Sequence, residues 1–396
     1  MDYGSHFRGD LFLTRSHGEE QRGDRARQTA DVQMAWRKGL TGVGAASVAF
    51  SGAAYYYRPD PSGELLESRR TRSPKDRCDD ATESEPVLLQ GARSAVMSTV
   101  AVLSRVVLFG FNNTRLVKDE RHTRLVDLVR DRPEGEPLLT VSNHASTLDD
   151  PAVVAVLLPW DVVLRPRLMR WSVCSQEICF ETPAISSFFG AGKVLPIERG
   201  AGLDQKLLLN FSRKLAAGGW CHIFPEGKTV QTGTIGGRSP PSSEDLGLLK
   251  WGVGRMIAHS PRTPRVIPFF HTGMQNLVAE DPATKDVLPR QPQPFNDITI
   301  RVGDAIEVAD LLAQHEDKHG PLWKYSAAVT KGGADDEQKW ASCSAADQQL
   351  YGAITRRVQA ALQALEEEAR SELGDAYPTT PRVVASGEYL SLLGKQ

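Results

Sequence analysis

A histidine and an aspartate stand five residues apart in a polar segment, residues 143–151. On an ideal helix His144 and Asp149 would lie about 140° apart, so they would not share a helical face. They can meet if His144 lies in a loop and Asp149 stands at the mouth of the helix that follows. The carboxylate would then hold one ring nitrogen and fix the tautomer, leaving the other nitrogen as a general base. Taken alone, this spacing also fits polar loop residues that cap a helix.

Three further segments stand at the ends of expected strands, and the first two of them carry polar or cationic residues. They are residues 192–199, 224–228 (Phe-Pro-Glu-Gly-Lys) and 266–269 (Val-Ile-Pro-Phe). Ligands characteristically bind α/β sheets at the carboxyl ends of their strands. Arg199 and Lys228 offer cationic donors to a phosphate, and arginine suits bidentate binding. Each residue alone is an ordinary surface charge, but four such segments in this order are not.

Strands and helices are predicted to alternate around these segments. Five short runs read as strands, and they are residues 138–142, 193–197, 220–224, 265–270 and 297–302. Helices are expected from Asp150 onward and at residues 204–217, 246–259 and 347–372. This alternation predicts an α/β fold, a single layered domain with a central mixed sheet flanked by helices.

The chain divides into three predicted parts. Residues 1–92 are an N-terminal extension with a charged linker, residues 93–312 the domain, and residues 313–396 a helical extension and tail. Within the first part, residues 39–57 carry no formal charge and just reach the length that spans a bilayer. A flexible segment rich in small residues, packed on the domain, would explain the same composition.

A second apolar segment, residues 94–111, is expected to be an amphipathic helix. Val96, Val100 and Leu103 share one helical face, and Ala101 falls on the other. A wide apolar face and a narrow polar face fit a helix that lies in the membrane interface. A core-facing helix fits the same pattern.

Composition narrows the class of protein. The formal net charge of −2 argues against a dedicated nucleic-acid-binding protein, which usually carries a basic excess. The five cysteines show no metal-type spacing, and we expect them to be reduced in an intracellular compartment. No Gly-x-Ser-x-Gly elbow occurs, which disfavours a serine lipase. Stretches 232–247 and 331–345 are expected to be inserted surface loops.

In their order, the four segments resemble the motifs of the glycerolipid acyltransferase superfamily. These motifs are His-x-x-x-x-Asp, a Gly…Pro-Ile-x-Arg block, Phe-Pro-Glu-Gly and a Val-Ile-Pro strand, and the resemblance covers roughly residues 95–310. It is most specific to the mitochondrial phospholipid–lysophospholipid transacylases. The resemblance implies His144 and Asp149 as the catalytic pair. It also implies a set of substrate-binding residues, namely Arg199, Glu226, Gly227, Lys228 and Pro268.

The function implied by this resemblance is exchange of acyl chains between glycerophospholipids and lysophospholipids, with remodelling of cardiolipin from monolysocardiolipin. It implies a protein associated with a mitochondrial membrane, inner or outer, facing the intermembrane space. No cofactor or metal is expected, because donor and product are both glycerol esters. A coenzyme A-dependent lysophospholipid acyltransferase shares the four motifs and is the alternative. A non-catalytic membrane scaffold would keep the apolar segments but would not need His144.

Overall fold

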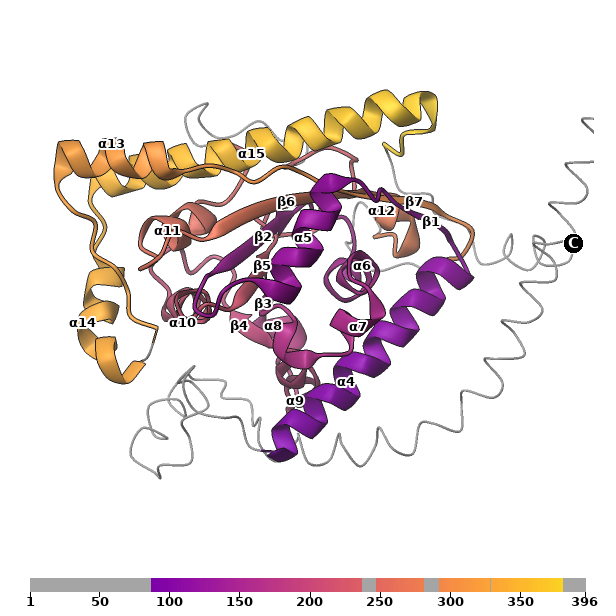
Figure 1. The fold of residues 1–396 in the computed structure, drawn as a ribbon, viewed down its shortest axis with the longest axis horizontal. Helices are drawn as coiled ribbons and strands as arrows, with labels where there is room; N and C mark the ends of the chain where they lie inside the picture. The colour runs from indigo at the N-terminus through magenta and orange to yellow at the C-terminus, as the bar shows by residue number, and fades with distance from the viewer. Residues whose placement is uncertain (1–86, 237–246, 281–291, 328, 380–396) are drawn as a thin grey trace, which may run out of the picture. The chain divides into compact units, whose positions relative to one another are not determined.

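The computed structural model of the chain describes residues 87–236, 247–280, 292–327 and 329–379. The predicted α/β class is confirmed, because a mixed sheet in this part of the chain carries helices on both faces (Figure 1). The segment 39–57, predicted as a possible membrane span, lies outside the described residues.

The main sheet has five strands in the order β1-β7-β6-β2-β5. β2 (Leu138–Ser142) lies between β5 (Trp220–Ile223) and β6 (Arg265–Thr272), and all three are parallel. β7 (Asp297–Val302) runs antiparallel to β6, and β1 (Asn113–Leu116) pairs with β7 at the edge. Every residue of β2 and β5 is buried, as expected for parallel strands covered on both faces. The carboxyl ends of β2, β5 and β6 therefore meet at one end of the sheet.

A second sheet of two parallel strands continues the domain beyond β5. It consists of β3 (Ser172–Ser175) and β4 (Val194–Ile197). Trp171, just before β3, forms a parallel bridge to Cys221 of β5, with backbone hydrogen bonds of 2.8 Å to either side of that residue. Strands β2, β5, β3 and β4 thus point the same way. The residues after β4 lie at the same end as those after β2.

Helices on one face of the main sheet enclose the larger hydrophobic core. α10 (Lys206–Ala216), α11 (Gly252–Ala258) and α15 (Ala345–Leu373) pack there against Leu139 and Val141 of β2. α15 begins with a capping box in which Ser344 and Asp347 bond each other's backbone amides. Its stripe of Leu350, Ile354, Val358 and Leu362, predicted to be structural, is buried.

The opposite face buries Leu138 of β2 and Ile267 of β6 beneath a second group of helices. These are α5 (Glu120–Asp131), α6 (Asp149–Leu157) and α7 (Trp160–Val163), with α4 (Val87–Arg105) packed against α6. The remaining short or peripheral helices are η4 (Val106–Gly110), η5 (Pro166–Leu168), α8 (Gln176–Cys179), α9 (Pro183–Ala191), α12 (Met274–Leu277), α13 (Ala309–His319) and η7 (Gly374–Ala376).

The predicted amphipathic helix is formed by α4 and η4, but its buried side differs from the predicted one. Met97 and Ala101 are buried, although Ala101 was expected on the polar side. The small Ala101 side chain lets α4 lie close to its neighbours in the core. Leu103 points outward, 51% exposed. Both sides of this helix are therefore apolar, and Leu89–Gly110 is long and apolar enough to cross a membrane, by length and composition only.

Two sequence-based expectations are wrong in this part of the chain. The stretch 331–345 is not a loop, because α14 (Val329–Ala341) and the start of α15 occupy it. Buried Trp340 and Asp336 anchor α14 despite its glycines, and Asp336 accepts hydrogen bonds from both the backbone N–H and the hydroxyl of Ser326.

The second correction concerns the cysteines, which are not all reduced. Cys174 in β3 and Cys179 at the end of α8 form a disulfide. One helical turn after a strand brings their Cα atoms to 6.0 Å, a separation that a disulfide can bridge. Cys221 and Cys343 are free thiols.

Candidate active site

The predicted catalytic pair meets where β2 leads into α6. His144 Nδ1 lies 3.0 Å from Asp149 Oδ2. The same oxygen accepts the backbone N–H groups of Ala145 (2.6 Å) and Ser146 (2.8 Å). These donors fix a carboxylate that is 1% exposed. α6 begins at Asp149 with Leu148 as its N-cap, two residues before the predicted N-cap Asp150, so the carboxylate stands at the mouth of the helix.

The His144 ring is oriented so that only one of its nitrogens is engaged. Because Asp149 accepts at Nδ1, Nε2 is the ring nitrogen left to receive a proton. Nε2 has no hydrogen-bond partner among the residues that the structure describes, and the side chain is 21% exposed. Phe224, directly after β5, stacks on the ring with centroids 4.1 Å apart. The arrangement suits a general base that is held at Nδ1 and on one ring face and is open at Nε2.

Glu226, from the Phe-Pro-Glu-Gly segment, holds the backbone around His144. Its Oε2 accepts the N–H of His144 and its Oε1 accepts the N–H of Gly236, both at 2.6 Å. The side chain is buried. Burial raises the pKa of Glu226 to about 7, although the two amides and the charge of His144 act to lower it. Glu226 therefore joins two loops at the carboxyl end of the sheet.

This raised pKa predicts a pH-dependent stability. The folded protein holds a proton on Glu226 between the ordinary value of 4.5 and about 7, where the unfolded chain has lost it. The free energy of unfolding should therefore fall as pH rises through this window, by about 3 kcal/mol. Glu226→Gln cannot ionise and should lack that fall. Urea unfolding of both proteins at pH 5 and pH 8 measures the difference, and equal pH dependence would contradict it.

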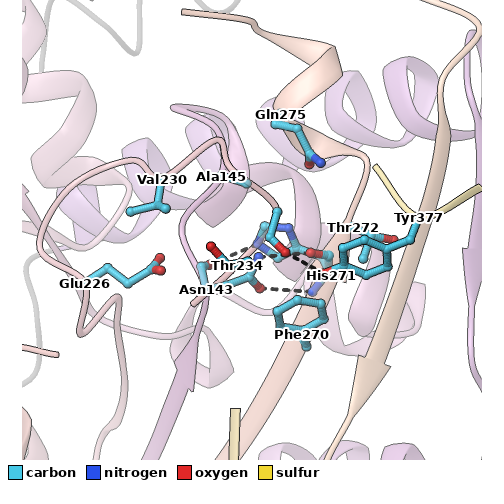
Figure 2. Close-up of a pocket in the computed structure, with 11 residues that line it drawn as sticks. Asn143, Ala145, Glu226, Val230, Thr234, Phe270, His271, Thr272, Gln275 and Tyr377 are labelled. Carbon is cyan, nitrogen blue, oxygen red and sulfur yellow. Dashed lines mark hydrogen bonds between the residues drawn. The ribbon is translucent and has the colours of Figure 1, made fainter. Parts of the chain in front are cut away.

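His271, at the carboxyl end of β6, completes the surroundings of the pair. Its Nε2 lies 3.1 Å from the carbonyl oxygen of Asn143 and 3.7 Å from Asp149 Oδ2. The Asn143 side chain exchanges two hydrogen bonds with the His271 backbone, at 2.9 Å and 3.0 Å. Figure 2 shows Asn143 and His271 joined in this way. Burial lowers the pKa of His271, so the ring is neutral beside the carboxylate.

A buried ion pair fixes α6 to the second sheet. Asp150 accepts two hydrogen bonds from Arg170, at 2.8 Å and 2.5 Å, and one from the Ser172 hydroxyl at 2.8 Å. Burial alone would raise the pKa of Asp150, but the guanidinium charge of Arg170 holds it below its ordinary value. The pair links the residue next to Asp149 with the start of β3.

Arg199 and Lys228, the cations predicted to bind phosphate, are less closely grouped than the residues around His144. Lys228 is exposed on the turn after β5, next to Gly227, whose φ of +68° suits glycine. Arg199 follows β4, and its Nε lies 3.5 Å from the Glu177 carboxylate, with about half of each side chain exposed. β4 is three strand positions from β2, or about 14 Å. Arg199 thus lies at the same end of the sheet as His144 but must reach back across β3 and β5.

Pro268 and the larger of two cavities lie outside this cluster. Pro268 lies within β6, pairs with Val141, and its ring faces Gly303 rather than the catalytic end. A cavity of about 10 Å³ beside Asn143, Glu226 and His271 is large enough for only one water (Figure 2). The larger cavity, about 440 Å³, lies at the amino ends of β2 and β6.

Asn143 and Phe224 begin two of the segments noted in the sequence, but neither they nor His271 were predicted to be site residues. Phe224 ends the predicted strand 220–224, and Asn143 and His271 directly follow the predicted strands 138–142 and 265–270. Polar and aromatic residues at the carboxyl ends of β2, β5 and β6 were the available signal, because these ends converge.

Comparison with known proteins identifies the family to which the chain is similar. A family model described as Acyltransferase matches residues 125–272. Tafazzin of Drosophila melanogaster is 36% identical over 57% of this chain and 54% of its own length, so the chain spans about half of that relative. An N-acylphosphatidylethanolamine synthase of Arabidopsis thaliana is 32% identical over 69% of this chain and 91% of its own. Tafazzin of Saccharomyces cerevisiae is 29% identical over 71% and 78%.

The α/β fold, the ordered motifs and these relatives define the class of protein. The chain belongs to the glycerolipid acyltransferase superfamily. Within that superfamily the predicted resemblance to tafazzin is confirmed.

Proposed function

We propose that this protein is a membrane-associated phospholipid–lysophospholipid transacylase with His144 as its general base. The observation that supports this most directly is the His144 ring, bound at Nδ1 by buried Asp149 and open at Nε2. It stands at the convergent ends of three parallel strands. Similarity to the tafazzins supports the substrate class, glycerophospholipids and lysophospholipids, with cardiolipin formed from monolysocardiolipin.

In the proposed reaction, Nε2 of His144 accepts the proton of a lysophospholipid hydroxyl as that oxygen attacks a phospholipid acyl ester. The glycerol oxygen of the donor leaves and takes the proton back, so one ester bond forms as another breaks. Asp149 stabilises the imidazolium between these steps. Because the bonds broken and formed are alike, the exchange is nearly isoenergetic and reversible. It requires no coenzyme A or metal.

Arg199 and Lys228 are proposed to bind the substrate phosphate, with Gly227 letting the backbone approach it. Both project from turns at the same end of the sheet as His144. Both oxygens of Glu226 already accept backbone amides, so we give Glu226 a positioning role instead.

Arg199→Lys tests the phosphate site. The charge is kept but the planar fork is lost, so we expect the KM for lysophospholipid to rise by about fivefold to tenfold. Turnover should change less if the phosphate is held equally in ground and transition states. Arg124→Lys is the control, since Arg124 is also an exposed arginine paired with a glutamate. Steady-state kinetics with unchanged KM and turnover in Arg199→Lys would remove Arg199 from the site.

The membrane-facing surface is proposed to be the outer side of α4, η4 and α7. Val102, Leu103 and Phe109 are 46%, 51% and 49% exposed, and Trp160 and Leu164 are 44% and 46% exposed at and just after α7. The Arg105 guanidinium lies 4.1 Å over the Trp160 ring, which joins the two elements. Large apolar side chains with an aromatic–cation pair suit the boundary between acyl chains and headgroups.

Negative charges placed on this apolar surface should release the protein from membranes. We expect the triple variant Val102→Glu, Leu103→Glu and Phe109→Glu to partition into anionic liposomes at least about tenfold more weakly, because three apolar contacts are lost. Ser94→Glu adds a charge at an exposed polar position of the same helix and is the control. Sedimentation with liposomes measures both. Equal binding of wild type and triple variant would exclude this surface as the docking site.

A mitochondrial membrane facing the intermembrane space is the proposed location, on the resemblance to tafazzin. The Cys174–Cys179 disulfide supports a compartment more oxidising than the cytosol.

The function is tested with purified protein, labelled phosphatidylcholine as donor and monolysocardiolipin as acceptor, without coenzyme A. Transfer of label to cardiolipin supports the proposal. Transfer only when an acyl thioester is added would favour the coenzyme A-dependent alternative.

Phosphatidylethanolamine should be a second acceptor, because the plant relative is an N-acylphosphatidylethanolamine synthase. Label on its amine alone would replace the O-acyl proposal.

A further inference from the structure

We infer that Glu226 and His271 together clamp the peptide bond that precedes His144 and so position the catalytic ring. This rests on the proposed role of His144 as base. The N–H of that peptide donates to Glu226 Oε2 at 2.6 Å. Its carbonyl, from Asn143, lies 3.1 Å from His271 Nε2. One rigid peptide plane is therefore held at both ends.

The hydrogen-bond chemistry fixes the state of His271. The Asn143 carbonyl oxygen can only accept, so Nε2 of His271 must carry the hydrogen. The nearby Asp149 Oδ2, at 3.7 Å, is also an acceptor and favours the same tautomer. His271 thus donates from Nε2, while Glu226 accepts. The acceptor Glu226 thus faces the N–H of the peptide, and the donor His271 faces its carbonyl.

The clamp spans three strands of the sheet. Glu226 follows β5, the Asn143–His144 peptide follows β2, and His271 ends β6. The paired side-chain amide of Asn143 extends the β2–β6 ladder past its last register pair, Ser142 with Phe269. A shift of either neighbouring strand would turn the peptide, and with it the direction in which Nε2 of His144 points.

The C-terminal helix secures the Glu226 side of the clamp. Glu226 Oε1 accepts the N–H of Gly236, and the preceding Ile235 N–H donates to Glu366 of α15 at 2.9 Å. The carbonyl of Gly233 accepts from Arg370 at 2.9 Å and from the Tyr377 hydroxyl at 2.7 Å. Residues far along the chain thus reach the catalytic histidine through one loop.

His271→Leu and His271→Gln separate positioning from packing. Leucine removes the donor, whereas the glutamine Nε2–H can replace it. We expect kcat to fall by about 10- to 100-fold in His271→Leu, with the lysophospholipid KM nearly unchanged, and most of kcat to return in His271→Gln. His259→Leu, at a buried histidine bonded to Trp323 and Tyr351, is the control for general loss of packing.

The backbone amide resonance of His144 is a readout that does not depend on activity. It is observed in protein labelled with ¹⁵N-histidine, where the nine histidines of the chain give the only labelled amides. The His144→Ala variant assigns it. It should shift in Glu226→Gln and in His271→Leu, but not in His259→Leu. A folded His271→Leu protein with unchanged kcat and unchanged resonance would overturn the clamp. The clamp would also be overturned if the reductions in kcat caused by Glu226→Gln and by His271→Leu, expressed as free energies, were simply additive in the double variant. An active His144→Ala enzyme would instead reject the proposed function and leave the amide test valid.

Discussion

Replacement of His144 by alanine should abolish measurable acyl transfer. In the proposed mechanism the imidazole accepts the proton of an alcohol that does not ionise near neutral pH, and a positioned base contributes about 10²- to 10⁴-fold. Among the described residues, His271 is the other histidine near Asp149. It does not offer an exposed ring nitrogen, because its side chain is 1% exposed and its Nε2 is hydrogen-bonded to the Asn143 carbonyl. Initial rates with labelled phosphatidylcholine and monolysocardiolipin measure the loss.

The folded structure should survive this substitution. His144 is partly exposed, and the hydrogen bonds that hold the loop come from its backbone, to Glu226 and from Val230, which alanine retains. Thermal unfolding and liposome binding should therefore match the wild type closely. His319→Ala, at an exposed histidine of α13, is the control for histidine loss. Full activity of His144→Ala would reject His144 as the base.

The buried strands were the most predictable elements. β2 and β7 have the predicted bounds, and β4, β5 and β6 differ by one or two residues at their ends. Helices cover both faces of these strands, and this burial requires apolar residues that are continuous or alternate along the strand. β1 and β3 were not predicted, because each has four residues and mixed polarity. Their pairing with β7 and β4 is long-range and leaves no local pattern.

Composition misled where tertiary anchors decide the structure. Residues 331–345 were predicted to be a loop. The backbone of Gly333 is not helical and kinks α14, but the helix continues beyond it because Trp340 is buried between aromatic residues of the core. Likewise Ala101 was predicted to lie on the polar face of its helix. It is buried instead, because α4 packs so close to the domain that a small side chain is needed there.

Within the site, proximity in sequence governed what could be predicted. His144 and Asp149 are joined by a short loop, so their contact followed from the strand-to-helix junction. The two amide bonds of Glu226 were beyond prediction, because its partners are 82 residues before it and 10 after it in the chain. His271 is 128 residues from Asn143. Sequence patterns identified which strand ends converge, whereas the contacts between them require the fold.

Asp149→Asn should lower kcat by about 10²- to 10⁴-fold while leaving the fold nearly intact. Oδ2 of Asp149 accepts His144 Nδ1 and the amides of Ala145 and Ser146. Oδ1 has no hydrogen-bond partner among the described residues. An asparagine can therefore keep its oxygen on these three donors and turn its NH₂ group to the unoccupied side.

The substitution thus removes the charge and retains the hydrogen bonds. The His144 tautomer is preserved, and what is lost is stabilisation of the imidazolium by the carboxylate, so the effect should fall on kcat and spare KM. Asp149→Ala is the comparison, because it also frees two buried amides and should cost about 1–3 kcal/mol of stability for each. Kinetics and urea unfolding of both variants separate charge from geometry. An Asp149→Asn enzyme that keeps nearly full turnover would show that orientation of His144 suffices and that the carboxylate charge has no catalytic part.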